Sequence, residues 1–203
     1  MTALIKQADL ELRDAIQAFV AGFAHPDLEH FKPGIAEWSD DWQGVSATRL
    51  PAADFLAASL ASAPPQTKPM VELLARHADD VKWEQTYTKA DTAISEKMLA
   101  SYGFVEVIGS RGPFVSEQVR SGIGVYGPGI GYPPHQHKAE EIYIVLAGGA
   151  EYRLDGQPPR YAKPGDLVFV PSMLTHGFYT GDEAMVVYYI WHDGDIRDFY
   201  TFV

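Results

Sequence analysis

The chain divides into two halves that differ in the spacing of their apolar residues. Between residues 2 and 23 the apolar side chains recur at steps of three and four, which places them on one stripe of an amphipathic helix. These residues are Leu12, Ile16, Phe19, Val20 and Phe23. Residues 51–65, 70–80 and 91–103 also predict helices, the last ending at Gly103 as a C′ glycine. We therefore expect residues 1–103 to form a helical N-terminal region.

After Gly103 the pattern changes to short runs rich in Val, Ile, Tyr and Phe, separated by glycine and proline. The runs are FVEVIG, SGIGVYG, EIYIVLAG, AEYRLDG, DLVFVP and AMVVYYIW. Many short strands of this kind predict an antiparallel sandwich or barrel over residues 104–203. Asp155-Gly156 is a turn signal and predicts a hairpin or its loop. The predicted fold class is α+β, mainly β with a helical N-terminal region packed on the barrel.

Composition narrows the classes of partner and of site. The 203 residues are 46% apolar, enough for a sizeable core, and 27 acidic against 16 basic side chains give a net charge of −11, which argues against a nucleic-acid partner. The absence of cysteine excludes disulfides, thiolate nucleophiles and thiolate-bound metals. The first residues reach charged side chains without a long apolar run, so we expect no membrane span and a cytoplasmic location.

One segment concentrates polar groups on a single side of a predicted strand. Side chains alternate between the two faces of a strand, and His135, His137, Glu141 and Tyr143 are all odd-numbered. Four polar groups on the inner wall of a barrel cost several kcal/mol if unpaired. A divalent cation compensates this cost. By the same parity, Glu140 is predicted to point outward.

A fourth metal ligand is predicted at His176, which follows the turn at Pro164-Gly165 and a buried strand. An antiparallel return of the chain brings this histidine beside the first group. Three imidazoles and one carboxylate suit a divalent transition metal and leave coordination positions open for water or substrate.

The spacing of these residues resembles the cupin superfamily. Its first motif, G-x5-H-x-H-x3-E-x6-G, is matched by Gly129, His135, His137, Glu141 and Gly148. Its second motif, G-x5-P-x-G-x2-H-x3-N, is matched by Gly165, Pro171 and His176, whereas Met173 replaces the glycine and Thr180 the asparagine. The resemblance implies a double-stranded β-helix, or jelly-roll, barrel preceded by helices. The two departures affect turn geometry rather than the metal ligands.

A narrower resemblance is to the bacterial cupin lyases of dimethylsulfoniopropionate, especially the DddQ type. The matching elements are Tyr132, Glu141-x-Tyr143 and Trp191. This resemblance implies β-elimination to dimethyl sulfide and acrylate, with a divalent metal (Fe²⁺, Zn²⁺ or Mn²⁺) acting as a Lewis acid. Tyr143 is the first candidate for the general base, because its face matches that of the ligands, and Tyr132 is the second. Aromatic faces for the sulfonium are expected from Tyr132, Trp191, and Tyr188 or Tyr189.

Two other functions stay open at this point. The same metal site serves a cupin dioxygenase or isomerase that acts on another small carboxylate. A non-catalytic cupin that binds a small ligand is the second alternative. In each case the partner is a small molecule, and the resemblance makes a homodimer a candidate assembly that the sequence does not fix.

Overall fold

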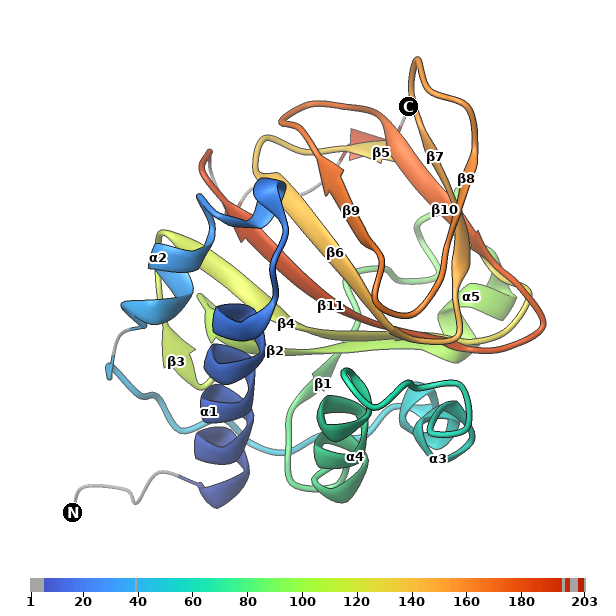
Figure 1. Ribbon diagram of the computed structural model, residues 1–203. Helices are drawn as coiled ribbons and strands as arrows, with labels where there is room; N and C mark the ends of the chain where they lie inside the picture. Colours follow the sequence, from blue (N-terminus) through green and yellow to red (C-terminus); the bar gives the residue numbers. More distant parts are fainter. Residues whose placement is uncertain (1–5, 39, 195, 198–200, 203) are drawn as a thin grey trace.

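Two β-sheets face each other across the interior of the second half of the chain (Figure 1). The computed structural model describes residues 6–38, 40–194, 196–197 and 201–202. The larger sheet contains β1 (Trp83–Glu84), β2 (Tyr102–Gly109), β3 (Phe114–Val115), β4 (Val119–Tyr126), β6 (Glu140–Ala147), β9 (Leu167–Val170) and β11 (Met185–His192). The smaller sheet contains β5 (Gly131–Gln136), β7 (Ala150–Leu154), β8 (Arg160–Ala162), β10 (His176–Thr180) and β12 (Thr201–Phe202).

The order of the strands confirms the predicted jelly-roll barrel. The larger sheet runs β1-β2-β4-β11-β6-β9, with β3 beside β2, and the smaller sheet runs β12-β5-β10-β7-β8. From β4 to β11 the chain passes back and forth between the sheets, and β7 and β8 form the hairpin predicted at Asp155-Gly156. This winding is a double-stranded β-helix.

Helices cover the outer face of the larger sheet. They are α1 (Gln7–Gly22), α2 (Lys32–Ala36), α3 (Leu56–Ser59) and α4 (Lys68–Arg76), with short 3₁₀ turns at Pro26–Leu28 and Pro51–Phe55. A further helix, α5 (Glu96–Ser101), contributes Met98 to the inner core instead. Figure 1 shows α1, α3 and α4 on one side of this sheet and the smaller sheet on the other. None of the helices formed by the described residues combines the length and the apolar content needed to cross a bilayer.

The larger sheet is buried on both faces, so it separates two apolar cores. On β6, Ile142, Ile144 and Leu146 pack against the helices, whereas the alternate residues Tyr143 and Val145 line the interior between the sheets. This double burial explains why the sequence shows continuous apolar runs rather than strict alternation. The stripe on α1 contributes Leu12, Ile16 and Val20 to the outer core, at about 2 kcal/mol for each buried side chain.

The N-terminal region joins the sheet as well as covering it. Strand β1 pairs with β2, and the boundary expected at residue 103 falls inside β2. Gly103 directly follows Tyr102, the C-cap of α5, but the prediction that it closes the helix as a C′ glycine is wrong, because its φ is not positive and it pairs with Val125 in the sheet. A Cβ atom at Gly103 would lie 3.0 Å from Leu50 and 3.3 Å from Ala52. The glycine therefore permits close packing rather than a turn.

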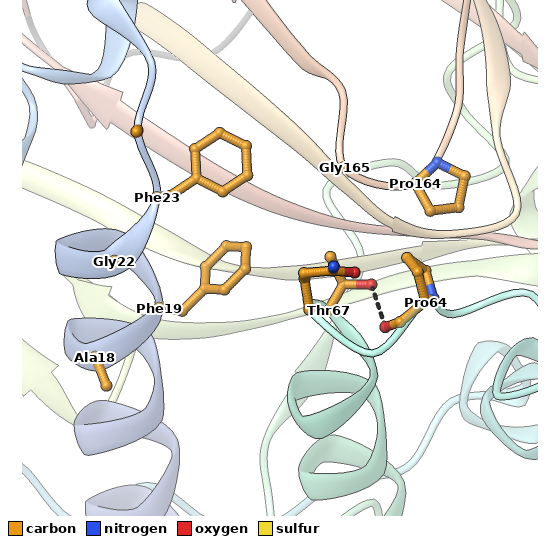
Figure 2. A pocket seen from close by; sticks show the side chains of 10 residues that line it. Ala18, Phe19, Gly22, Phe23, Pro64, Thr67, Pro164 and Gly165 are labelled. Carbon is orange, nitrogen blue, oxygen red and sulfur yellow. Dashed lines mark hydrogen bonds between the residues drawn. The ribbon is translucent and has the colours of Figure 1, made fainter.

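A cleft of about 600 Å³ opens between the end of α1 and two loops on the outer side of the larger sheet. Figure 2 shows Phe19 and Phe23 on one wall, with Pro64, Thr67 and Pro164 on the other. Thr67 does not offer its hydroxyl to the cleft, because Oγ1 donates to the Leu146 carbonyl at 2.6 Å. The cleft is thus mainly apolar and lies on the helical side of the sheet, away from the interior.

The glycines of the two motifs occupy turns that need a left-handed backbone. Gly129, Gly148 and Gly165 have φ values of 61°, 65° and 92°, a region that favours glycine because it carries no Cβ. At Gly148 space is limiting too, since a Cβ atom would lie 2.1 Å from the carbonyl oxygen of Ala184. This turn connects β6 to β7 and so sets the position of both sheets around the interior.

Replacing Gly148 tests how strongly this turn is constrained. Gly156 is a matched control, because it has a similar φ of 73° but open space where a Cβ would lie. We expect Gly156→Ala to lower the free energy of unfolding by about 1 kcal/mol, the cost of a left-handed L residue, and Gly148→Ala to lower it by about 3–5 kcal/mol because a backbone clash adds to that cost. Urea denaturation of the two variants measures the difference. Equal losses would show that the close approach to Ala184 carries no cost.

Candidate metal centre

Three histidines from two strands and a turn converge in the interior. His135 lies on β5 opposite His176 at the start of β10, and His137 follows β5 directly. One ring nitrogen of each histidine lies within 4.8 Å of one from each of the others, and all three side chains are buried. The ring centroids of His135 and His176 are 4.1 Å apart, and those of His137 and His176 are 5.0 Å apart. The structure thus brings together the three histidines predicted from the motifs.

Each histidine is held in one tautomer by its own backbone neighbourhood. The Nδ1 atoms of His135, His137 and His176 lie 2.9, 2.8 and 2.9 Å from the carbonyl oxygens of Pro133, Ala139 and Leu174. A carbonyl oxygen only accepts hydrogen bonds, so Nδ1 carries the proton in each ring. Nε2 is therefore the ring nitrogen that can ligate a metal, which is the usual arrangement of metal-binding histidines.

Glu141 completes the predicted group from β6. Its Oε2 atom lies 3.0 Å from Nε2 of His137 and 3.4 Å from Nε2 of His176. Because both rings carry their proton on Nδ1, these contacts set a carboxylate oxygen against nitrogen lone pairs in a buried space. His176 Nε2 has no hydrogen-bond partner. A cation among these atoms would offset the repulsion between the Glu141 oxygen and the nitrogen lone pairs, and would give His176 Nε2 a partner. The residues present therefore fit a divalent metal bound by nitrogen and oxygen.

The charge states of two of these residues also suit metal binding. Burial and the neighbouring His176 lower the pKa of His135 to about 3, so its ring is neutral at physiological pH. Burial raises the pKa of Glu141, yet that pKa lies well below its ordinary value, so the side chain is an ionised carboxylate. A neutral imidazole and an ionised carboxylate are the forms that bind metals.

Aromatic rings enclose the histidines. Tyr132 stacks on His135 at 4.3 Å between ring centroids, and Trp191 stacks on His137 at 4.2 Å. Tyr143 lies on the inner face of β6, with its ring centroid 6.4 Å from that of His176. Burial, and next to it the charge of Glu141, raise the pKa of Tyr143 well above its usual range. Tyr132, Tyr143 and Trp191, all expected near the site, are thus placed beside it.

The two tyrosines of β11 point in opposite directions. Tyr188 faces the helices, where its ring lies 5.9 Å from that of Phe19 and Ser121 donates a hydrogen bond to its hydroxyl. Tyr189 faces the interior and is the cross-strand partner of Tyr143. The structure therefore does not bring Tyr188 to the histidines. Of the pair, Tyr189 is the one whose ring lies on the interior side, 6.2 Å from that of Phe104.

One aromatic neighbour comes from the N-terminal region and has no signal in the sequence. Tyr87, in the segment between β1 and α5, shares a hydrogen bond between its hydroxyl and that of Tyr132. Its ring lies 5.6 Å from the Tyr132 ring. The segment around Tyr87 shows neither strand alternation nor a motif spacing, so only the fold reveals this contact.

At the two positions that depart from the second cupin motif, the backbone conformation and hydrogen bonds of the replacing residues hold the turns. Met173, which replaces a glycine, adopts a left-handed φ of 61° and donates its backbone N–H to the His137 carbonyl at 2.8 Å. Thr180, which replaces an asparagine, donates its hydroxyl to the Gly127 carbonyl at 2.8 Å and accepts the N–H of Ile130 at 2.9 Å. The backbone around the ligands is thus held although both motif residues differ.

Comparisons with known proteins agree on one family. A model of the dimethylsulfoniopropionate lyase family matches residues 36–187. The chain is 36% identical over 116 residues to the dimethylsulfoniopropionate lyase DddQ of Ruegeria pomeroyi, covering 57% of this chain and 56% of that protein. It is 33% identical over 130 residues to a putative dimethylsulfoniopropionate lyase, DddL, of Cereibacter sphaeroides, covering 63% of this chain and 53% of that protein. In these alignments the chain spans about half the length of the relatives.

Solved structures match over nearly the whole chain. The crystal structure of DddQ from Ruegeria pomeroyi has a TM-score of 0.85 at 28% identity and covers 98% of both chains. A structure from a study of the lyases RdDddP and RnDddQII gives a TM-score of 0.85 at 27% identity and covers 97% of both chains. The helical half is therefore shared with these proteins along with the barrel.

Loss of one histidine tests the metal centre. We expect Co²⁺ or Zn²⁺ to raise the unfolding temperature of the wild-type protein. At a hundred times its Kd, the metal should raise the free energy of unfolding by about 2.7 kcal/mol. His176→Ala removes one of three converging nitrogens and should weaken binding by about 100-fold or more, beyond the loss typical of a residue that only supports a ligand.

His25→Ala is the control for that measurement. His25 lies outside the cluster, where its ring accepts the Asp27 N–H at the start of a 3₁₀ turn. This variant should respond to metal like the wild type. Thermal unfolding at several metal concentrations measures all three proteins. If metal stabilised His176→Ala as much as the wild type, the ion would not lie among these histidines.

Proposed function

This chain belongs to the dimethylsulfoniopropionate (DMSP) lyase family, and on that premise we propose that it cleaves DMSP by β-elimination into dimethyl sulfide and acrylate. The observation that supports the proposal is the buried group of three Nε2 lone pairs and one carboxylate, enclosed by tyrosines. The group offers a cation site and phenolic oxygens in one water-poor space. These are the two components that an elimination next to a carboxylate needs.

The proposed cofactor is one divalent transition metal held by His135, His137, Glu141 and His176. Nitrogen and oxygen ligands of this kind accept Fe²⁺, Zn²⁺ or Mn²⁺. When bound, such an ion supplies positive charge that acidifies the C–H next to a coordinated carboxylate and favours the phenolate form of a nearby tyrosine. The ion serves as a Lewis acid in this proposal, and the reaction involves no change of oxidation state.

The proton transfer falls to a tyrosine. A phenolate oxygen takes a proton from the carbon next to the carboxylate, and the electron pair of that C–H bond forms the new double bond. The C–S bond then breaks with its electron pair moving to sulfur, so the sulfonium leaves as neutral dimethyl sulfide. Acrylate remains and the tyrosine is protonated. Atoms and charges balance without an oxidant or reductant.

Tyr143 is the base that the arrangement favours. It lies two residues after Glu141 on the same strand and therefore on the same face. Burial and the charge of Glu141 raise its pKa, so without a cation the phenol keeps its proton. The base is thereby active only when the site holds its ion. Tyr132, stacked on His135 and hydrogen-bonded to Tyr87, is the second candidate.

The sulfonium end of the substrate needs an apolar wall with electron-rich faces. Tyr132 and Tyr189 provide rings on the interior side of the barrel, and an aromatic face attracts a desolvated cation by about 2 kcal/mol. Trp191 was expected in this role from the sequence, and its ring stacks on His137. We assign the sulfonium to the tyrosine rings.

Removing single hydroxyls tests the assignment of the base. Tyr143→Phe should lower the rate of dimethyl sulfide release by about 10²–10⁴-fold, the usual contribution of a positioned base, with metal content unchanged. Tyr132→Phe should lose less. Tyr161→Phe is the control, because Tyr161 is 59% exposed on the outside of the smaller sheet. Gas chromatography of metal-loaded protein incubated with DMSP under anoxic conditions gives the rates.

Two outcomes would contradict the proposal. Release of dimethyl sulfide by Tyr143→Phe at the wild-type rate would exclude Tyr143 as the base. A requirement for oxygen would exclude elimination, because that reaction consumes none, and would favour a cupin dioxygenase.

A further inference from the structure

An arginine with 12% of its side chain accessible lies beside Trp191 on the inner face of the larger sheet. Arg120 on β4 is the cross-strand partner of Trp191 on β11, and Trp191 is in turn the partner of Glu141 on β6. Cross-strand partners point to the same face. The three side chains therefore form a row that runs from the edge of the interior to the metal ligands.

Glu106 on β2 holds this arginine in place. Its side chain is fully buried, and Oε2 accepts a hydrogen bond from Arg120 Nε at 2.8 Å. Its other oxygen accepts the backbone N–H groups of Arg111 and Gly112 at 2.7 and 3.0 Å. A carboxylate with this many donors is fixed in one position, so the guanidinium bound to it is fixed as well.

Trp191 has planar neighbours at short range. The centre of the Arg120 guanidinium lies 4.9 Å from the indole centroid, and the His137 ring lies 4.2 Å from it, tilted by 27°. Arg120 reaches the indole from β4, whereas His137 belongs to the turn after β5 in the opposite sheet. The indole thus bridges the buried ion pair and one of the three histidines.

His137 is the histidine that most needs such support. His135 and His176 are cross-strand partners within a paired ladder, but His137 lies beyond the end of β5 at Gln136. Its backbone is anchored through the Met173 N–H, and its Nδ1 through the Ala139 carbonyl. These contacts, together with the 3.0 Å approach of Nε2 to Glu141, leave the ring able to tilt about the line through its two nitrogens. A stacked indole prevents it.

We propose that Arg120, held by Glu106, is a positioning residue that keeps Trp191 stacked on His137 and so fixes the direction of the His137 Nε2 lone pair. The inference rests on the metal centre of the proposed function and on no property of the substrate. In this inference, Trp191 connects the Arg120 guanidinium to a metal ligand by contacting both. It also explains why a charged pair is buried next to an apolar interior, where it would otherwise be costly.

Arg111 provides a matched control for Arg120. Its Nε lies 3.5 Å from the same Glu106 oxygen, and its guanidinium lies 5.5 Å from the Phe104 ring, the same distance as that of Arg120. Within the described part of the chain, Arg120 is the arginine of the two that stacks on Trp191. Arg111 is more exposed, with 29% of its side chain accessible against 12%. Loss of either arginine leaves Glu106 with one cation fewer.

Co²⁺ binding separates the two arginines. Arg120→Met should weaken Co²⁺ affinity by about 10–100-fold, as for other residues that orient a metal ligand, and should alter the visible absorption of the bound ion. Arg111→Met should lose stability but keep an affinity within about twofold of the wild type, because its loss leaves the orientation of the ligands unchanged. Wild-type affinity in Arg120→Met, or an equal loss in Arg111→Met, would overturn the inference.

A double-mutant cycle with Trp191→Leu tests the route through the indole. Once the indole is gone, adding Arg120→Met should change Co²⁺ affinity by less than about twofold, because residues acting through one contact are not additive. Additive losses would overturn the inference. Arg120→Lys serves if Arg120→Met does not fold, since the ammonium still pairs with Glu106 but does not stack as a plane. It should bind Co²⁺ more weakly than the wild type, and wild-type affinity in it would also overturn the inference.

These measurements use the metal alone and no DMSP. If the wild-type protein itself failed to bind Co²⁺, the metal centre of the proposed function would be refuted. If the wild type bound Co²⁺ and the Arg120 variants bound it equally well, the positioning role alone would be refuted.

Discussion

The structure depends on one electrostatic constraint, the meeting of three nitrogen lone pairs and a carboxylate in a space closed to water. Backbone carbonyls hold the proton of each histidine on Nδ1, so the Nε2 atoms of His137 and His176 face the Glu141 oxygen without a hydrogen between them. Such an arrangement costs several kcal/mol unless positive charge compensates it. A bound cation would do so.

The two-faced larger sheet is what makes this enclosure possible. Its outer face is covered by α1, α3 and α4, which frees the inner face to carry polar and aromatic groups among apolar ones. The N-terminal region therefore does more than cover the sheet. Strand β1 extends it, and Tyr87 reaches through to Tyr132 at the site. The helical half and the barrel together form the surroundings of the histidines.

The sequence predicted the parts of this arrangement that depend on local spacing. Strand parity placed Glu141 and Tyr143 on one face, and the resemblance to DMSP lyases is confirmed by the family match. Contacts that depend on how distant segments pack were not predicted. Tyr87 and the Glu106–Arg120 pair carry no local pattern, and the choice between Tyr188 and Tyr189 needed the register of β11. The prediction that His135, His137 and Glu141 lie on one strand is wrong, because His135 lies on β5 in the smaller sheet and His137 in the turn that leads to β6. Strand β5 shows no strand pattern of its own, since Pro133 and Pro134 are poor strand residues.

Anomalous diffraction from crystals grown with Co²⁺ tests the central claim most directly. The account predicts one strong peak about 2.1 Å from the Nε2 atoms of His135, His137 and His176, with Glu141 as an oxygen ligand at a similar distance. The Nδ1 atoms should keep their bonds to the three carbonyls. A peak elsewhere, coordination through Nδ1, or no peak among these residues at saturating Co²⁺ would contradict it.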